Sequence, residues 1–130
     1  MNHWERDHKD AKEKNGGVLE MCFSNGSLFP QNTSYRINFS QEIFFVSFFN
    51  DARDVHIWIT ILAGPAKAEN FNYQVKLFNE NGENLSYLGK IHSICKKPEK
   101  IIIEGSGFTV PSRFFSDRFG VTCKLTLGNL

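Results

Sequence analysis

The sequence lacks any long apolar run. No stretch of its 130 residues approaches the roughly 20 apolar residues that span a bilayer. The first eight residues, from Met1 to His8, are too polar and too charged to form the apolar core of a signal peptide. We therefore expect a cytoplasmic protein, with the nucleus as a second location, and no membrane partner.

The sequence also lacks an excess of charge of either sign. Lys and Arg number 15 against 14 Asp and Glu, so the net charge is +1. One basic cluster, Lys96 to Lys100, is short and interrupted by Pro98 and Glu99. Such a balance gives no extended field for holding a polyanion, so we expect no nucleic-acid partner.

Cysteine is scarce and its spacing is uninformative. Cys22, Cys95 and Cys123 are odd in number, widely separated and form no Cys-x-x-Cys pair, so we interpret them as reduced thiols in the core. His3 and His8 have the spacing of the second half of a zinc finger. Two ligands do not close a zinc site, so these histidines are candidate ligands only if a finger is completed upstream.

Signatures of catalysis are missing as well. The nearest candidate for an activated nucleophile is Cys95 with His92, but side chains three positions apart on a strand point to opposite faces. We interpret this pair as a surface histidine beside a buried cysteine. The glycines at 105 and 107 lack the rest of a nucleotide-binding fingerprint. We therefore expect a chain that is itself non-catalytic and a folded domain that holds no cofactor.

What the sequence does contain is a series of short segments with the two-residue period of strands. In residues 71–78 and 85–91 apolar and polar residues alternate, and the Asn-rich loop of residues 79–84 between them contains an Asn-Gly pair, which predicts a hairpin. The eight predicted strands are Val18–Phe23, Tyr35–Phe39, Ile43–Phe49, Val55–Leu62, Phe71–Phe78, Leu85–Ile91, Lys100–Ile103 and Val121–Leu127.

This arrangement is typical of an all-β protein, an antiparallel β-sandwich of about eight strands. The only helical signal is a short turn at residues 112–119, with Ser112 as its N-cap. Residues 1–17 form a polar lead with little to bury, and residues 18–130 form the sandwich domain.

One block of the sequence resembles a known family. Residues 64–94 contain Ala68-Glu69-Asn70-Phe71 and Tyr73, followed at the expected places by Leu85-Ser86-Tyr87 and Ser93-Ile94. This block is similar to a segment of the seven in absentia family in which these residues precede and form two successive strands. Weaker similarities extend the match over nearly the whole chain, in order: His3 to Lys9, Phe29-Pro30 with Tyr35, Phe114-Phe115, Gly120-Val121 and Leu125 to Leu127.

The resemblance implies a function in protein degradation. Members of this family are RING-type E3 ubiquitin ligases in which zinc fingers precede a TRAF-like β-sandwich that dimerises and binds substrates or adaptors. Residues 1–17 resemble the end of such a finger, so zinc is expected only in an upstream finger or RING that this chain does not contain. The chain would be the substrate-binding domain, a homodimer that captures extended peptide segments by adding them to a sheet edge.

The resemblance also selects a candidate site at residues 34–39. We predict that Tyr35 is an aromatic anchor, that Ile37 and Phe39 extend the same pocket, and that Arg36 lies beside them. Arg36 and Asn38 depart from the apolar residues that the family has here. Two alternatives stay open: Tyr35, Ile37 and Phe39 face the core, or the sandwich binds carbohydrate through exposed aromatic residues and Asn-rich loops such as residues 79–84. A zinc-dependent or cysteine-dependent enzyme is a third, weaker hypothesis.

Overall fold

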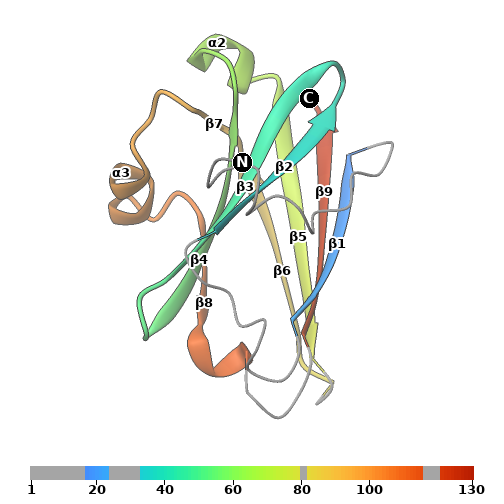
Figure 1. Cartoon of the computed structure of the whole chain (residues 1–130), viewed down its shortest axis with the longest axis vertical. Coiled ribbons are helices and arrows are strands. Elements are labelled where there is room, and N and C mark those ends of the chain that lie inside the picture. Colours follow the sequence, from blue (N-terminus) through green and yellow to red (C-terminus); the bar gives the residue numbers. More distant parts are fainter. Residues whose placement is uncertain (1–16, 24–32, 80–81, 116–120) are drawn as a thin grey trace, which may run out of the picture.

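The computed structural model describes residues 17–23, 33–79, 82–115 and 121–130, and its architecture is two β-sheets packed face to face (Figure 1). The first sheet has four antiparallel strands in the order β1-β9-β5-β6. Its strands are β1 (Val18–Phe23), β5 (Phe71–Asn79), β6 (Asn84–Lys90) and β9 (Val121–Asn129).

The second sheet has the order β2-β3-β4-β7, and β8 pairs with β4 further along the same edge. Its strands are β2 (Thr33–Phe39), β3 (Glu42–Asn50), β4 (Asp54–Ile61), β7 (His92–Ser93) and β8 (Phe108–Pro111). Only the two-residue pairing of β4 with β7 is parallel. In the described part of the chain neither sheet closes on itself, so the predicted all-β sandwich is confirmed.

Alternation of side chains explains why the strands fold as they do, and β5 is the clearest case. Phe71, Tyr73, Val75 and Leu77 are at most 6% exposed, whereas the residues between them face outward. Because successive side chains of a strand point to opposite faces, this period places four large apolar groups on one side. β5 lies between β9 and β6 in the centre of its sheet, and its apolar face forms much of the core.

The opposite half of the core comes from β3 and β4. Their buried inward side chains are Phe44, Val46 and Phe48 on β3 and Val55, Ile57, Ile59 and Ile61 on β4. The ring of Phe44 packs edge-on against that of Phe71 from the other sheet, with centroids 5.1 Å apart. Interdigitation of this kind across the two inner faces is what holds a sandwich together.

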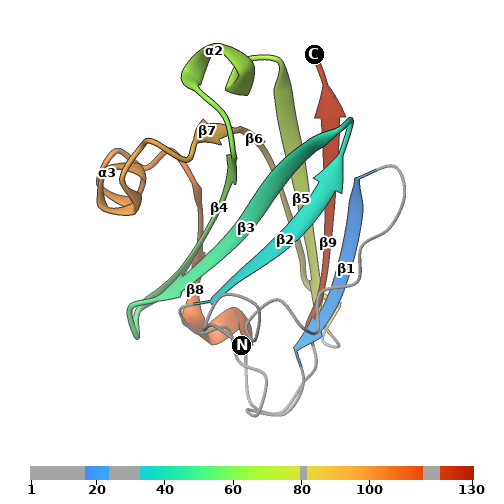
Figure 2. The same ribbon diagram turned by 45° about the horizontal axis from the view of Figure 1, so that its top comes forward.

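One side of the sandwich is closed by aromatic stacking between the two sheets. Tyr87 on β6 and Phe108 on β8 lie parallel with ring centroids 5.0 Å apart. β6 and β8 therefore border the same side, and the strand orders place β1 and β2 on the opposite side. Figure 2 shows β2 at the margin of its sheet, on the side where β1 borders the other sheet.

The predicted hairpin at residues 71–91 is confirmed. β5 and β6 pair in antiparallel register, and the Asn79 amide N–H donates to the Glu83 carbonyl at 3.0 Å. The Asn79 side chain reinforces the turn, because its Oδ1 accepts from the Glu83 N–H at 3.0 Å. Gly82 has a φ of 85°, a backbone conformation that favours glycine.

The helical segments are short. The predicted helical turn is present as a 3₁₀ helix, η1 (Ser112–Phe115), while residues 116–119 lie outside the described part. The prediction of a strand at Lys100–Ile103 is wrong, since these residues belong to the helix α3 (Pro98–Ile103). Pro98 occupies the first turn of α3, where its fixed φ favours a helix and its missing N–H costs nothing.

α3 and a second one-turn helix, α2 (Pro65–Ala68), lie in connections beside the second sheet (Figure 1). Ile101 of α3 is 1% exposed and Ile103 is 83% exposed. The helical period separates these two neighbours, which a strand would have placed on one face. β1 begins at Val18, where the sandwich domain was predicted to begin; residues 1–16 lie outside the described part.

Candidate functional site

The candidate binding segment forms β2, which is an edge strand. Within the described residues β2 pairs with β3 alone. The seven residues of β2 make it a longer edge than the four residues of β8 on the other side of the same sheet. An edge strand of this length exposes a row of backbone donors and acceptors that an extended chain can pair with.

The hydrogen-bond register decides which residues of β2 face that edge. The Ile43 carbonyl accepts from the Leu62 N–H at 2.8 Å, so the backbone of Ile43 faces β4. Backbone direction alternates along a strand, so Phe44 and Val46 face β2, where they pair with Ile37 and Tyr35. The backbone groups of the residues between, Ser34, Arg36 and Asn38, consequently point to the outer edge.

The side chains of Tyr35, Ile37 and Phe39 face the core, which is one of the two alternatives that the sequence left open. Ile37 has no exposed surface and cannot anchor a partner. Tyr35 and Phe39 are half-buried and pack against the core. Tyr35 meets Phe48 edge-on at 5.8 Å, and the Phe39 centroid lies 6.2 Å from that of Phe44. Only the remaining exposed parts of these two rings could contact a bound chain.

Arg36 is the exposed member of the predicted site. It lies on the outward face at the middle of β2, where its Nε donates to Asn38 Oδ1 at 3.3 Å. Its cross-strand neighbour on β3 is Phe45, which is 7% exposed. Two residues along the strand, the hydroxyls of Ser34 and its cross-strand neighbour Ser47 lie 3.0 Å apart. The solvent face of β2 is therefore polar, with one cation at its centre.

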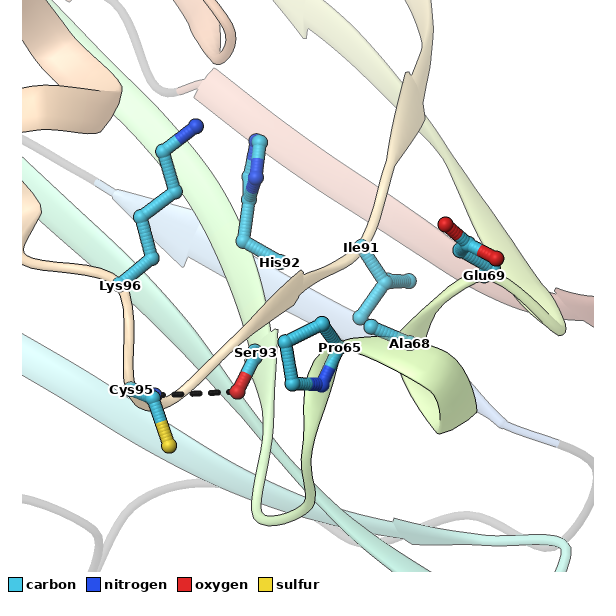
Figure 3. A pocket seen from close by; sticks show the side chains of 8 residues that line it. All are labelled: Pro65, Ala68, Glu69, Ile91, His92, Ser93, Cys95 and Lys96. Carbon is cyan, nitrogen blue, oxygen red and sulfur yellow. Dashed lines mark hydrogen bonds between the residues drawn. The ribbon is translucent and has the colours of Figure 1, made fainter.

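A hollow of about 360 Å³ lies elsewhere, between α2 and β7 (Figure 3). It is lined by Pro65, Ala68, Glu69, Ile91, His92, Ser93, Cys95 and Lys96. Burial and the nearby Lys96 ammonium lower the pKa of His92, which favours the neutral ring, while the backbone of Ser106 acts in the opposite direction. The Nε2 of His92 is buried without a hydrogen-bond partner in the described structure.

His92 and Cys95, which both line this hollow, do not form a nucleophilic site. In Figure 3 His92 points away from Cys95, and the Cys95 backbone N–H donates to Ser93 Oγ at 3.1 Å. Cys95 itself is exposed, as is Cys22, and only Cys123 is buried. The prediction of three core thiols is therefore right for Cys123 alone. Burial raises the pKa of the Cys123 thiol to about 12, which keeps it protonated and unreactive.

A hydrogen-bonded chain of three side chains was not foreseen from the sequence. Asp51 Oδ2 lies 2.9 Å from His56 Nε2, and His56 Nδ1 lies 3.2 Å from Thr109 Oγ1. Asp51 Oδ1 also accepts from the backbone N–H groups of Arg53 and Asp54 at 3.0 and 2.8 Å. The bond to His56, followed by these backbone bonds, lowers the pKa of Asp51 to about 2.

This chain of bonds joins the β3–β4 turn to β4 and β8. His56 is further held by Phe49, whose ring stacks on the imidazole with centroids 6.0 Å apart. Thr109 is exposed on the edge strand β8. We interpret the three side chains as a clasp that fixes the end of this sheet. His56 and Thr109 are 53 residues apart in the sequence, so no local motif indicated the group.

The candidate zinc ligands His3 and His8 lie outside the described residues. Within residues 17–23, 33–79, 82–115 and 121–130, no three His, Cys, Asp or Glu side chains are grouped in a way that could hold a metal ion. In the same part of the chain, every helix falls short of the length and apolar character that crossing a membrane requires.

A scan against models of protein families found no match, and a search of curated proteins found none either.

Proposed function

We propose that this chain is a protein–peptide recognition domain that binds substrates or adaptors for ubiquitin-dependent degradation, as the substrate-binding domain of a seven in absentia-type ubiquitin ligase does. The observation that carries the proposal is the position of β2. The segment that the family resemblance selects, residues 34–39, is an edge strand with an outward-facing backbone. The two-sheet fold agrees with a sandwich of this class.

In this proposal, the partner adds as a strand beside β2. Its backbone N–H and C=O groups pair with those of Ser34, Arg36 and Asn38, which supply affinity. Its side chains then alternate between two faces. Those on the inner face meet the exposed parts of Tyr35 and Phe39, and those on the outer face lie beside Arg36. Recognition is therefore non-covalent and needs no cofactor in this domain.

N-methylation of a bound peptide tests this mode directly. Peptides that bind the 130-residue chain are first selected from a displayed library of random sequences, and one is then methylated at each backbone nitrogen in turn. Strand addition requires that every second methyl group abolishes binding, because only alternate N–H groups face β2. Affinities measured by isothermal titration would show a two-residue period. An affinity profile without that period would contradict strand addition.

A proline variant tests the same idea from the side of the protein. Arg36→Pro removes an N–H that faces the outer edge and leaves the β2–β3 hydrogen bonds intact. Ser86→Pro is the matched control, because Ser86 is exposed on β6, a seven-residue edge strand of the other sheet, and its backbone also faces outward. We expect Arg36→Pro to abolish binding and Ser86→Pro to retain it, with folding checked by circular dichroism. Loss of binding in both variants would place the site elsewhere.

Homodimerisation belongs to the same proposal. Sedimentation equilibrium of the 130-residue chain measures it, and a mass of one chain at micromolar concentration would contradict it.

A further inference from the structure

Arg36 is an exposed cation at the centre of the candidate binding edge. Its Nε donates to Asn38 Oδ1, which orients the guanidinium and leaves its two terminal nitrogens as donors. No carboxylate in the described part of the chain forms an ion pair with Arg36. By contrast, Lys67 pairs with Glu42 at 2.8 Å and Lys96 pairs with Glu104 at 2.5 Å. As far as the described residues are concerned, the charge of Arg36 is thus available to a partner.

The geometry of strand addition fixes which residue of a partner meets this charge. Arg36 has its backbone turned to the outer edge and its side chain on the solvent face. In an antiparallel addition, the partner residue that exchanges both hydrogen bonds with Arg36 places its side chain on that same face, with a Cα–Cα distance of about 5.5 Å. A carboxylate at that position would reach the guanidinium.

We propose that the β2 edge selects extended peptides with Asp or Glu at the position directly opposite Arg36. This inference rests on the proposed function and specifies its partner as an acidic strand. Oppositely charged cross-strand pairs stabilise a sheet, and the planar guanidinium matches a carboxylate with two parallel hydrogen bonds. The charge complements peptides whose outward-facing positions are acidic and repels those with Lys or Arg there.

The same charge disfavours a second copy of this chain as the occupant. If two β2 strands paired antiparallel in full overlap about Arg36, the two guanidinium groups would lie opposite each other on one face. Like charges directly opposite destabilise a sheet, and charged side chains on edge strands are a known device against such self-association. A homodimer of this chain would therefore use another surface, and the β2 edge is left for a peptide.

Peptide selection on charge variants tests the inference. A displayed library of random ten-residue peptides is selected in parallel on the wild-type chain, Arg36→Gln, Arg36→Glu and Arg36→Pro, with Ser86→Pro as the control for an altered edge. We expect enrichment of Asp and Glu at one position on the wild type and on Ser86→Pro. Arg36→Gln should lose this preference, and Arg36→Glu should replace it with Lys and Arg.

Affinity for a selected acidic peptide gives the magnitude. An exposed ion pair contributes about 0.2 to 1 kcal/mol, which is about a 1.4-fold to 5-fold change in Kd. Arg36→Gln should weaken binding of the acidic peptide by that factor. It should leave unchanged the Kd of a second peptide in which Gln replaces the Glu opposite Arg36. The difference between the two peptides should shrink in 500 mM salt, because exposed charges are screened there.

The outcomes separate this inference from the proposed function. Suppose that the peptides selected on the wild type show no enrichment of Asp or Glu, or that the same enrichment appears on Arg36→Glu. The acidic preference is then wrong, and edge recognition stands. If every peptide selected on the wild type is also selected on Arg36→Pro, or if the wild type selects no peptide at all, both the acidic preference and edge recognition by β2 are wrong.

Discussion

The hydroxyl of Tyr73 is a buried group whose removal should stabilise the protein. Tyr73 is 1% exposed in the core, and in the described structure its hydroxyl has no hydrogen-bond partner. A buried polar group without a partner costs about 1 to 3 kcal/mol. Tyr73→Phe removes this cost and loses only the contacts of one oxygen atom. We expect the free energy of unfolding to rise by about 1 kcal/mol and Tm to rise by roughly 4 °C.

Urea titration at pH 7 measures this change, and Tyr87→Phe is the matched control. Tyr87 is half-buried with its ring stacked on Phe108, so loss of its hydroxyl should change stability by less than about 0.5 kcal/mol. The reasoning would be refuted if Tyr73→Phe were less stable than the wild type by about 1 kcal/mol, the contribution of a typical hydrogen bond. That result would mean that the hydroxyl is bonded, for example to a buried water molecule.

A second measurement uses alkaline pH. Burial raises the pKa of Tyr73 above its ordinary value of 10.0. The unfolded chain therefore releases this proton at a lower pH than the folded chain does, and stability declines as pH rises above 10. Tyr73→Phe should reduce the decline, and Tyr87→Phe should reduce it less, because burial is the larger cause of the raised pKa of Tyr73 and the electrostatic interaction with Tyr87 is the smaller one.

Three further substitutions have defined expectations. Asp51→Asn should flatten the acid dependence of Tm, because the lowered pKa of Asp51 gives stability that is present above pH 3.8 and lost as pH falls towards 2; Tm measured from pH 5 to pH 2 checks this. Cys123→Ala should reduce the loss of stability between pH 9 and pH 12 by up to about 1.4 kcal/mol per pH unit. The reason is that burial raises the pKa of the thiol from 9.0 to about 12, so that the thiol ionises at lower pH in the unfolded chain than in the folded one. Urea titrations at several pH values measure how steeply the free energy of unfolding falls in each protein. Gly89→Ala should destabilise by about 1 to 3 kcal/mol, because a Cβ there would lie 2.5 Å from Cζ of Tyr73; an unchanged urea midpoint would contradict this packing.

The central strands could be predicted from the sequence because their burial follows a local rule. β5 has one buried and one exposed face, so its two-residue period is visible in the sequence itself. The hairpin was visible for a related reason, since Asn79 and Gly82 supply the turn chemistry between two such strands. Neither feature depends on contacts with distant parts of the chain.

The misassigned helix shows where that rule stops. Ile101, Ile102 and Ile103 are three β-branched residues in a row, a composition that favours a strand but carries no period. Pro98, which occupies the first turn of α3, is the local signal that indicates a helix start here. β7 has two residues and β8 has four, and segments this short show no alternation of their own.

The structure shows on which face of β2 each residue of the candidate site lies. Along a strand, the direction of the backbone hydrogen-bonding groups and the face of the side chain both alternate with a period of two residues. Residues whose backbone faces the same neighbouring strand therefore have their side chains on the same face of the sheet. Tyr35, Ile37 and Phe39 bond to β3 through their backbone, and their side chains lie in the core. The alternation of apolar and polar residues in β2 itself favours the core for this set, whereas the family resemblance assigned the same residues to a pocket.

This parity has a consequence for specificity. A strand that adds to β2 bonds to the backbone of Ser34, Arg36 and Asn38 and meets the exposed side chains of Arg36 and Asn38. The aromatic residues Tyr35 and Phe39, by contrast, already pack against Phe48 and Phe44. If β2 is the binding edge, a bound strand therefore meets polar side chains and one cation on its outer face, and the exposed parts of aromatic rings on its inner face.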